Sequence, residues 1–114
     1  MDTFDQNLSV IEWNYEKVHI PYISPRDGKY HQYFVDFWLR MEDTNGVIHT
    51  KLIEVKPKKQ TVPPKPLAKG QRMTARKREA IMVWLVDEAK WKAAKKYCEA
   101  MKWEWTIVTE DHLH

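Results

Sequence analysis

The chain has 114 residues, a length that suits one domain, residues 1–114, with a modest hydrophobic core. Its single cysteine excludes an internal disulfide and a zinc site built from several thiolates, and it indicates a reducing compartment. The sequence has no apolar stretch of membrane-spanning length, and its first residues lack the basic start and apolar core of a signal peptide. A soluble cytosolic protein is therefore expected.

The net charge of +3 is distributed unevenly along the chain. Residues 51–78 contain ten Lys or Arg and one acid, which gives this block a local charge of +9 and leaves −6 for the remainder. Such a block is typical of proteins that bind DNA, because Lys and Arg displace counterions from phosphates. A solvated, partly disordered linker is the alternative interpretation. The block supplies four candidate DNA contacts: Lys65, Lys69, Arg72 and Arg76.

The first fourteen residues form a polar lead-in, in which Phe4, Leu8 and Ile11 occur at helical spacing and predict a short helical segment. From residue 15 to residue 22 the apolar residues alternate with other residues, which is the period of a strand. The segment Ser-Pro-Arg-Asp-Gly-Lys at 24–29 predicts a tight connection. We therefore expect a hairpin.

The second strand of this hairpin is expected at residues 30–41, with His31 near its start as a candidate phosphate contact. Asp36 lies in the middle of this otherwise aromatic strand. Strand interiors disfavour Asp, and a buried carboxylate needs a cation, a metal or water nearby. An Asp that faces solvent or accepts a backbone N–H bond is the alternative.

Asn45-Gly46 is the strongest hairpin signal in the chain, and it predicts that a strand at 47–55 pairs with the strand that contains Asp36. This register places Asp36 opposite residue 53 or 54, so that Asp36 and Glu54 lie side by side. Facing like charges destabilise a sheet unless a cation lies between them. A divalent ion is the economical candidate.

Glu54 and Lys56 share one face of the predicted strand because successive side chains alternate between faces. Two carboxylates and a backbone carbonyl can hold Mg²⁺ over a phosphate. Lys56 can then orient an attacking water or stabilise the developing charge. The alternative is an edge strand that carries charges to prevent aggregation.

The prolines at 63, 64 and 66 end the sheet, so residues 57–72 are expected to form a mobile, basic loop. A helix is expected from Thr74, followed by a second helical segment capped by Asp87. A core-facing stripe is predicted on that second segment at Trp91, Ala94, Cys98 and Met101, where Cys98 serves packing. Residues 103–108 alternate as a last strand. The order β-β-β-loop-α-β predicts an α/β (α+β) domain with a mixed sheet covered by a helix.

The segments Tyr-Phe-Val-Asp-Phe at 33–37 and Ile-Glu-Val-Lys at 53–56 resemble the PD-(D/E)XK nuclease superfamily, with Val35 in the place of the proline of its name. Residues 20–29, 54–61, 90–94 and 109–110 extend the likeness, in order, to the head-completion nuclease family of T-even-type tailed phages. This resemblance implies a restriction-endonuclease-like fold and a Mg²⁺- or Mn²⁺-dependent endonuclease that hydrolyses phosphodiester bonds in phage DNA, at head completion or packaging. It implies three sets of site residues: Asp36 and Glu54 as metal ligands, Lys56 as the catalytic lysine, and Lys58, Lys59 and Gln60 as DNA contacts.

Nucleases of this kind carry a further acid on a helix before the first strand, and the phage family extends further at that end. Glu16 is the candidate third acid and metal ligand, with Glu12 as the alternative. Otherwise a phage structural protein or a second chain, as in a homodimer, would complete the site.

Two alternative functions stay open. One is a catalytically incomplete DNA-binding or capsid-associated protein on the nuclease fold, and the other is a branched-DNA resolvase. The expected location is the host cytoplasm or the virion, with DNA and no membrane as partner.

Overall fold

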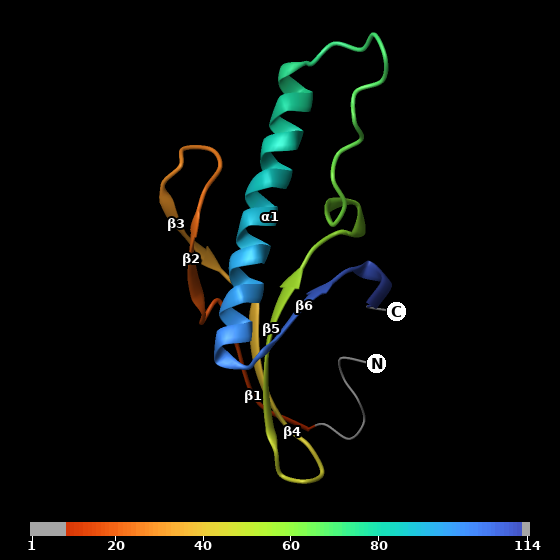
Figure 1. Ribbon diagram of the computed structural model, residues 1–114. Helices are drawn as coiled ribbons and strands as arrows, with labels where there is room; N and C mark the ends of the chain where they lie inside the picture. The colour runs from red at the N-terminus through yellow and green to blue at the C-terminus, as the bar shows by residue number, and fades with distance from the viewer. Residues whose placement is uncertain (1–8, 113–114) are drawn as a thin grey trace.

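Two β-sheets and one long helix make up residues 9–112, which are the residues that the computed structural model describes (Figure 1). In chain order the elements are β1 (Ser9–Tyr15), β2 (His19–Ile23), β3 (Tyr30–Phe34), β4 (Phe37–Glu42), β5 (Ile48–Val55), the 3₁₀ turn η1 (Lys58–Gln60), α1 (Ala75–Met101), β6 (Glu104–Val108) and the 3₁₀ turn η2 (Glu110–His112). The predicted class, a mixed sheet with a helix packed on it, is confirmed.

The larger sheet has the strand order β1-β4-β5-β6. Neighbouring strands are antiparallel except β5 and β6, which are parallel. Parallel neighbours need a crossover connection, and α1 supplies it. The Asn45-Gly46 hairpin between β4 and β5 is confirmed: Asp43 N–H donates to the carbonyl of Val47, and Gly46 adopts a φ of 79°, which glycine tolerates without strain.

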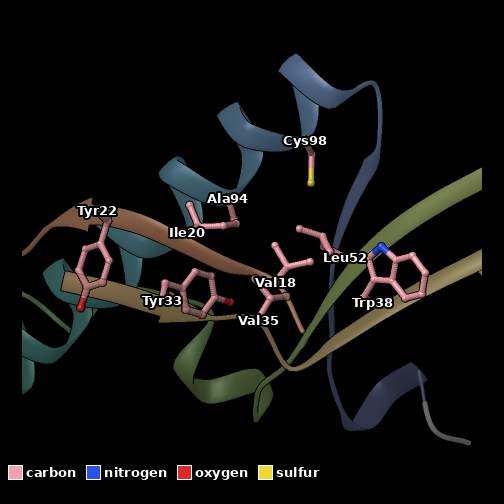
Figure 2. Packing of buried hydrophobic residues seen from close by; sticks show 9 residues of the cluster. All are labelled: Val18, Ile20, Tyr22, Tyr33, Val35, Trp38, Leu52, Ala94 and Cys98. Atoms are coloured by element: carbon pink, nitrogen blue, oxygen red, sulfur yellow. The ribbon is translucent and has the colours of Figure 1, made fainter. Parts of the chain in front are cut away.

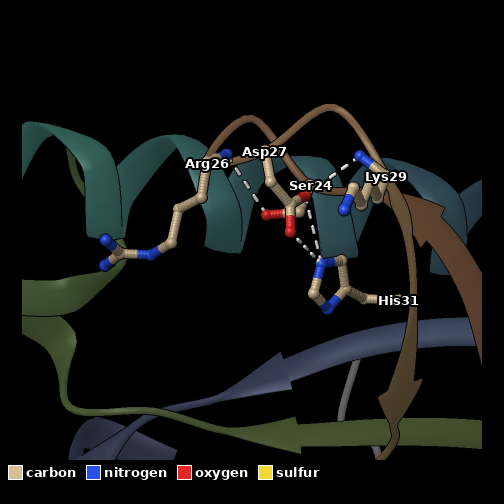
Figure 3. A network of polar contacts seen from close by, with 5 residues as sticks. All are labelled: Ser24, Arg26, Asp27, Lys29 and His31. Carbon is tan, nitrogen blue, oxygen red and sulfur yellow. Dashed lines mark hydrogen bonds and ion pairs between the residues drawn. The ribbon is translucent and has the colours of Figure 1, made fainter.

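The smaller sheet is the predicted hairpin, formed by β2 and β3, but its first strand begins at His19 and not at Tyr15, which ends β1. Ile20 pairs with Tyr33, and both side chains are buried. Figure 3 shows the connection at its tip. The Asp27 carboxylate accepts a hydrogen bond from Lys29 N–H at 2.9 Å and also lies 2.9 Å from Nε2 of His31. Arg26 in the same turn pairs with Glu79 of α1, which fastens the hairpin tip to the helix.

The predicted strand at 30–41 is wrong as a single element, because β3 ends at Phe34 and β4 begins at Phe37. The two strands belong to different sheets, so the chain must bend between them, and Asp36 lies in this bend. The bend is held by backbone bonds from Val35 N–H to the carbonyl of Val18 and from Glu16 N–H to that of Asp36, both at 3.1 Å. Asp36 is therefore at a strand end and half-buried.

The predicted helical segment near Ile11 is also wrong, since residues 9–15 form β1 at the edge of the larger sheet. Phe4 and Leu8 lie outside the described residues. The backbone of β4 offers a free edge on this side, and the β-branched and aromatic residues of 10–15 favour pairing with it. This strand and the break at 35–36 explain why five strands, rather than three, precede the basic loop.

Helix α1 is continuous from Ala75 to Met101, so Asp87 lies in its interior and does not cap a second segment. No glycine or proline interrupts residues 75–101, and Thr74 caps the start by accepting a bond from Lys77 N–H at 3.0 Å. No helix within residues 9–112 is long and apolar enough to cross a membrane.

The hydrophobic core lies where α1 meets both sheets (Figure 2). Ala94 and Cys98 of the predicted stripe are buried there, and Trp91 is half-buried, but Met101 is exposed because it lies in the final turn of the helix. Burial raises the pKa of the Cys98 thiol to about 11, which keeps it protonated and suits its predicted packing role. The remaining core residues come from both sheets and the bend between them: Val18, Ile20, Tyr22, Tyr33, Val35, Trp38 and Leu52.

Candidate active site

Asp36 directly precedes β4, and Glu54 is the second-last residue of the neighbouring strand β5, so both lie at the same end of the larger sheet. The last residue pair of β4 and β5 is Phe37 with Ile53, so the next position on each strand is Asp36 and Glu54. This is the register that the Asn45-Gly46 turn predicted. Asp36 Oδ2 accepts a hydrogen bond from Val55 N–H at 2.8 Å, which fixes the carboxylate against the end of β5.

Glu54 is a buried acid, with 6% of its surface exposed. The phenol of Tyr33 donates a hydrogen bond to Glu54 Oε2. Burial raises the pKa of Glu54 to about 7, the positive charges of Lys56 and Lys90 oppose this shift, and the negative charge of Asp87 adds to it. A carboxyl group with such a pKa in a partly polar site is a candidate functional group.

Lys56 is brought beside α1 rather than into bulk solvent. Its backbone N–H donates to the carbonyl of Val108, so the pairing of β5 with β6 continues one residue beyond the strand. Its Nζ lies 3.8 Å from Oδ2 of Asp87, and both side chains are largely shielded from solvent. Lys56 is thus held next to Glu54 by an ion pair with the helix.

Asp87 is a site residue that the sequence interpretation missed, because it was assigned to a helix cap. It is buried, with 7% of its surface exposed. The signal was present in the spacing: with Trp84, Trp91, Ala94 and Cys98, Asp87 falls on one helical stripe at i, i+3, i+7, i+10 and i+14. An acid on the core-facing stripe of a helix needs a partner, and Lys56 is that partner.

Lys90, one turn after Asp87 on α1, adds a second cation to the site. Its Nζ lies 5.8 Å from the ring centre of Tyr33 and 5.9 Å from that of Tyr22, within the range of cation–π attraction. The helix therefore contributes an acid and a cation to the same place.

Of the two candidate third acids, Glu16 has its backbone next to Asp36, and Glu12 does not lie there. The backbone of Glu16 is hydrogen-bonded to Asp36 and adopts a φ of 52° at the end of β1. Glu12 lies on the exposed surface of β1, where it pairs with Arg40 at 3.1 Å and with Lys17 at 3.8 Å.

The donor set at the strand ends fits a hard divalent cation. Within residues 9–112 no three His, Cys, Asp or Glu side chains are grouped as a metal centre. Mg²⁺ is typically held by only one or two protein carboxylates, with water molecules as the other ligands. Asp36 and Glu54 supply that number of carboxylates, and both offer the oxygen donors that Mg²⁺ and Mn²⁺ prefer.

The predicted DNA contacts are not all alike. Lys58 is already engaged, since its N–H donates to Glu110 at 2.8 Å and its Nζ lies 2.8 Å from Asp111. His31 is paired with Asp27 at the hairpin tip rather than placed beside Glu54.

The other predicted contacts follow the segment between β5 and α1. Lys59 and Gln60 line a cleft together with Lys56. Arg72 and Arg76 line a second cleft, of about 270 Å³, near the start of α1. Lys65 and Lys69 are exposed on the same segment.

The fold is that of a nuclease-like α+β domain, and the comparisons give its class. The family described as TnsA-like endonuclease N terminal matches residues 7–110, so the chain belongs to this family. Among curated proteins, the head completion nuclease of Enterobacteria phage T4 is 39% identical over 110 residues, which cover 96% of this chain and 71% of that protein. No solved structure matches the chain. The nuclease resemblance carried by the sequence motifs is confirmed.

Proposed function

We propose that this chain is a Mg²⁺- or Mn²⁺-dependent DNA endonuclease that hydrolyses phosphodiester bonds during phage DNA processing, at head completion. The observation that carries the proposal is the register of β4 and β5, whose continuation by one residue sets Asp36 opposite Glu54, with Lys56 two residues further on. Family membership and the name of the phage T4 relative support the reaction type and the setting. The host cytoplasm and the virion are the corresponding locations.

In this proposal Asp36 and Glu54 hold the metal ion. When bound, the ion supplies Lewis-acid stabilisation of the phosphate and lowers the pKa of a bound water. Glu54 must lose its proton to act as a ligand, and its pKa of about 7 places this step near neutral pH. The Tyr33 hydrogen bond orients the Glu54 carboxyl group.

Lys56 stabilises the negative charge that develops on the phosphate. The ion pair with Asp87 keeps the Lys56 ammonium group directed into the site, so Asp87 acts as a positioning residue. Glu16 is the candidate third acid, because its backbone is bonded to Asp36.

The test is cleavage of supercoiled plasmid in Mg²⁺, in Mn²⁺ and in EDTA. We expect cleavage only with a divalent ion, and a rate loss of about 100-fold or more in Glu54→Ala and Lys56→Ala. The first substitution removes a proposed ligand of the metal ion, and the second removes the positive charge that stabilises the transition state. Matched controls are Glu99→Ala and Lys96→Ala, two exposed residues of α1, which should cut like the wild type. Equal activity in the site variants and the wild type would rule out the site.

A second candidate function is a catalytically incomplete protein that binds DNA or the capsid. It is favoured by the lack, within residues 9–112, of any group of three His, Cys, Asp or Glu side chains that could hold a metal ion. It predicts salt-sensitive DNA binding that survives Asp36→Asn, without cleavage in any divalent ion. A branched-DNA resolvase would instead cut four-way junctions in preference to linear and nicked duplexes. Linear, nicked and four-way DNA substrates together therefore distinguish the nuclease, the binding protein and the resolvase.

A further inference from the structure

A cleft of about 390 Å³ opens beside Lys56, between the segment that follows β5 and the N-terminal half of α1. In Figure 1 this segment rises alongside the helix before it turns into the helix start. Lys56 and Asp87, the ion pair of the candidate active site, belong to the lining of the cleft. Whatever binds there lies next to Lys56 of the candidate active site.

Part of the cleft wall is apolar, and it carries one aromatic ring, that of Trp84. Val62, Pro63 and Pro64 come from the segment after β5, and Val83 and Trp84 come from α1. The indole of Trp84 packs edge-to-face against that of another helix residue, Trp91, with ring centres 5.7 Å apart and an angle of 81° between the planes. This contact holds the Trp84 ring in place.

Lys59 and Gln60 line the cleft on the side of η1, and Ala80 and Glu79, whose carboxylate pairs with Arg26, line it on the side of α1. Unlike Lys58, which is paired with Asp111, Lys59 makes no ion pair within residues 9–112. Its ammonium group is available for an anion. The cleft therefore combines an aromatic wall with an uncompensated cation.

This combination suits one nucleotide. Proteins bind unpaired nucleotides by stacking the bases on aromatic side chains and by placing cations along the backbone. The volume is near the lower end of the range of roughly 300–1,000 Å³ for small-ligand sites, which leaves no room for a base pair with both of its backbones. A base inside a duplex must leave its stack to enter such a cleft.

We propose that this cleft binds a single unpaired nucleotide of the substrate strand, with its base against Trp84 and its phosphate on Lys59. The proposal rests on the nuclease function proposed above and narrows its substrate class. The preferred DNA carries unpaired nucleotides, as at single-stranded overhangs, gaps or branch points.

Binding without cleavage tests the cleft directly. The full chain, in EDTA and at fixed salt, is titrated into a fluorescein-labelled duplex with a single-stranded overhang and into a blunt duplex of the same paired sequence, and anisotropy is measured. We expect tighter binding to the overhang. Trp84→Ala should weaken overhang binding about tenfold, the scale of removing one base-stacking interaction, and change blunt-duplex binding less than twofold. The matched control is Trp13→Ala, which removes an exposed indole from β1, away from the cleft, and should change neither affinity.

Two further variants guard against a folding defect. Trp84→Phe keeps an aromatic ring and should retain most of the overhang affinity. Lys59→Gln alters an exposed side chain and should also weaken overhang binding. Equal wild-type affinity for the two substrates, or an equal loss on both in Trp84→Ala, would overturn the proposal.

Cleavage of the same substrates in Mg²⁺ separates this proposal from the proposed function. Overhang binding that depends on Trp84, without any cleavage, would reject the nuclease and keep the cleft. Cleavage that is indifferent to the overhang and to Trp84 would reject the cleft and keep the nuclease.

Discussion

At the residue scale, Glu54 is the group whose chemistry the fold changes most. Burial raises its pKa from an ordinary 4.5 to about 7. Between these pH values the folded chain binds more protons than the unfolded chain, so the free energy of unfolding falls as the pH rises through this window. Below about pH 4.5 both states carry the proton and this contribution is constant. Ionisation of this buried carboxyl group lowers the stability of the fold, and a cation bound to the carboxylate would offset that cost.

This titration predicts the pH dependence of stability without metal. In EDTA, the wild type should lose more stability between about pH 5 and about pH 7.5 than Glu54→Gln, which cannot ionise. Urea unfolding at the two pH values measures the difference. The stability loss of Asp87→Asn should lie between those of the wild type and Glu54→Gln, because the Asp87 charge raises the pKa of Glu54.

The control for that series is Glu99→Gln, which removes an exposed carboxylate and should follow the wild type. Parallel pH curves for the wild type and Glu54→Gln would show that Glu54 ionises at its ordinary pKa in the folded chain.

At the element scale, α1 both covers the core and carries part of the candidate site. Ala94 is fully buried against the sheets, and its small side chain lets the helix approach them closely. The same helix presents Asp87 to Lys56 and Lys90 to Tyr33. The position of the helix therefore sets the position of two charges, and a shift of α1 would alter the site.

Ala94→Leu is expected to cost about 1–3 kcal/mol of unfolding free energy, because three extra carbons must enter a filled interface. It should also slow cleavage, since the displaced helix carries Asp87. The matched control is Ala100→Leu on an exposed position of the same helix, which should change stability by less than about 0.5 kcal/mol. Thermal or urea unfolding gives the comparison, and an equal effect of the two substitutions would contradict the packing argument.

At the scale of the whole molecule, positive charge is concentrated in the segment between β5 and α1. The cations of residues 56–78 begin two residues after Glu54 and continue to the start of α1, so a DNA backbone that reaches the candidate metal site could follow this segment. DNA affinity should therefore depend strongly on salt, because each phosphate that a cation neutralises releases counterions.

Replacing Lys65, Lys69 and Arg72 together with Gln should reduce the slope of log K against log[salt] by about 1 for each phosphate that is no longer neutralised. Fluorescence anisotropy over a salt series measures this slope. The matched control replaces three other lysines with Gln, which changes the net charge equally, and it should leave the slope nearly unchanged. These lysines lie in the C-terminal half of α1 and directly after it: Lys95, Lys96 and Lys102. An equal reduction of the slope in both triple variants would mean that net charge, and not this segment, governs binding.

Local patterns predicted much of this architecture from the sequence. The Asn45-Gly46 turn determined the register of β4 and β5, and with it the approach of Asp36 to the end of β5. The residue alternation of 15–22 predicted a strand there, of which the part from His19 onward belongs to β2. Both rest on short-range geometry, which neighbouring residues specify by themselves.

By itself, the sequence determined the nuclease motif residues, the hairpin register and the concentration of positive charge in one segment. Only the tertiary structure decided three other features: the strand break that places Asp36 in a bend, the burial that shifts the pKa of Glu54, and the arrival of Asp87 beside Lys56. The physical reason is that a bend between two sheets, the exclusion of water and an ion pair 31 positions apart in the sequence all depend on how distant elements pack. Local periodicity can place Asp87 on the core-facing stripe of α1, but it does not specify which distant residue that stripe contacts.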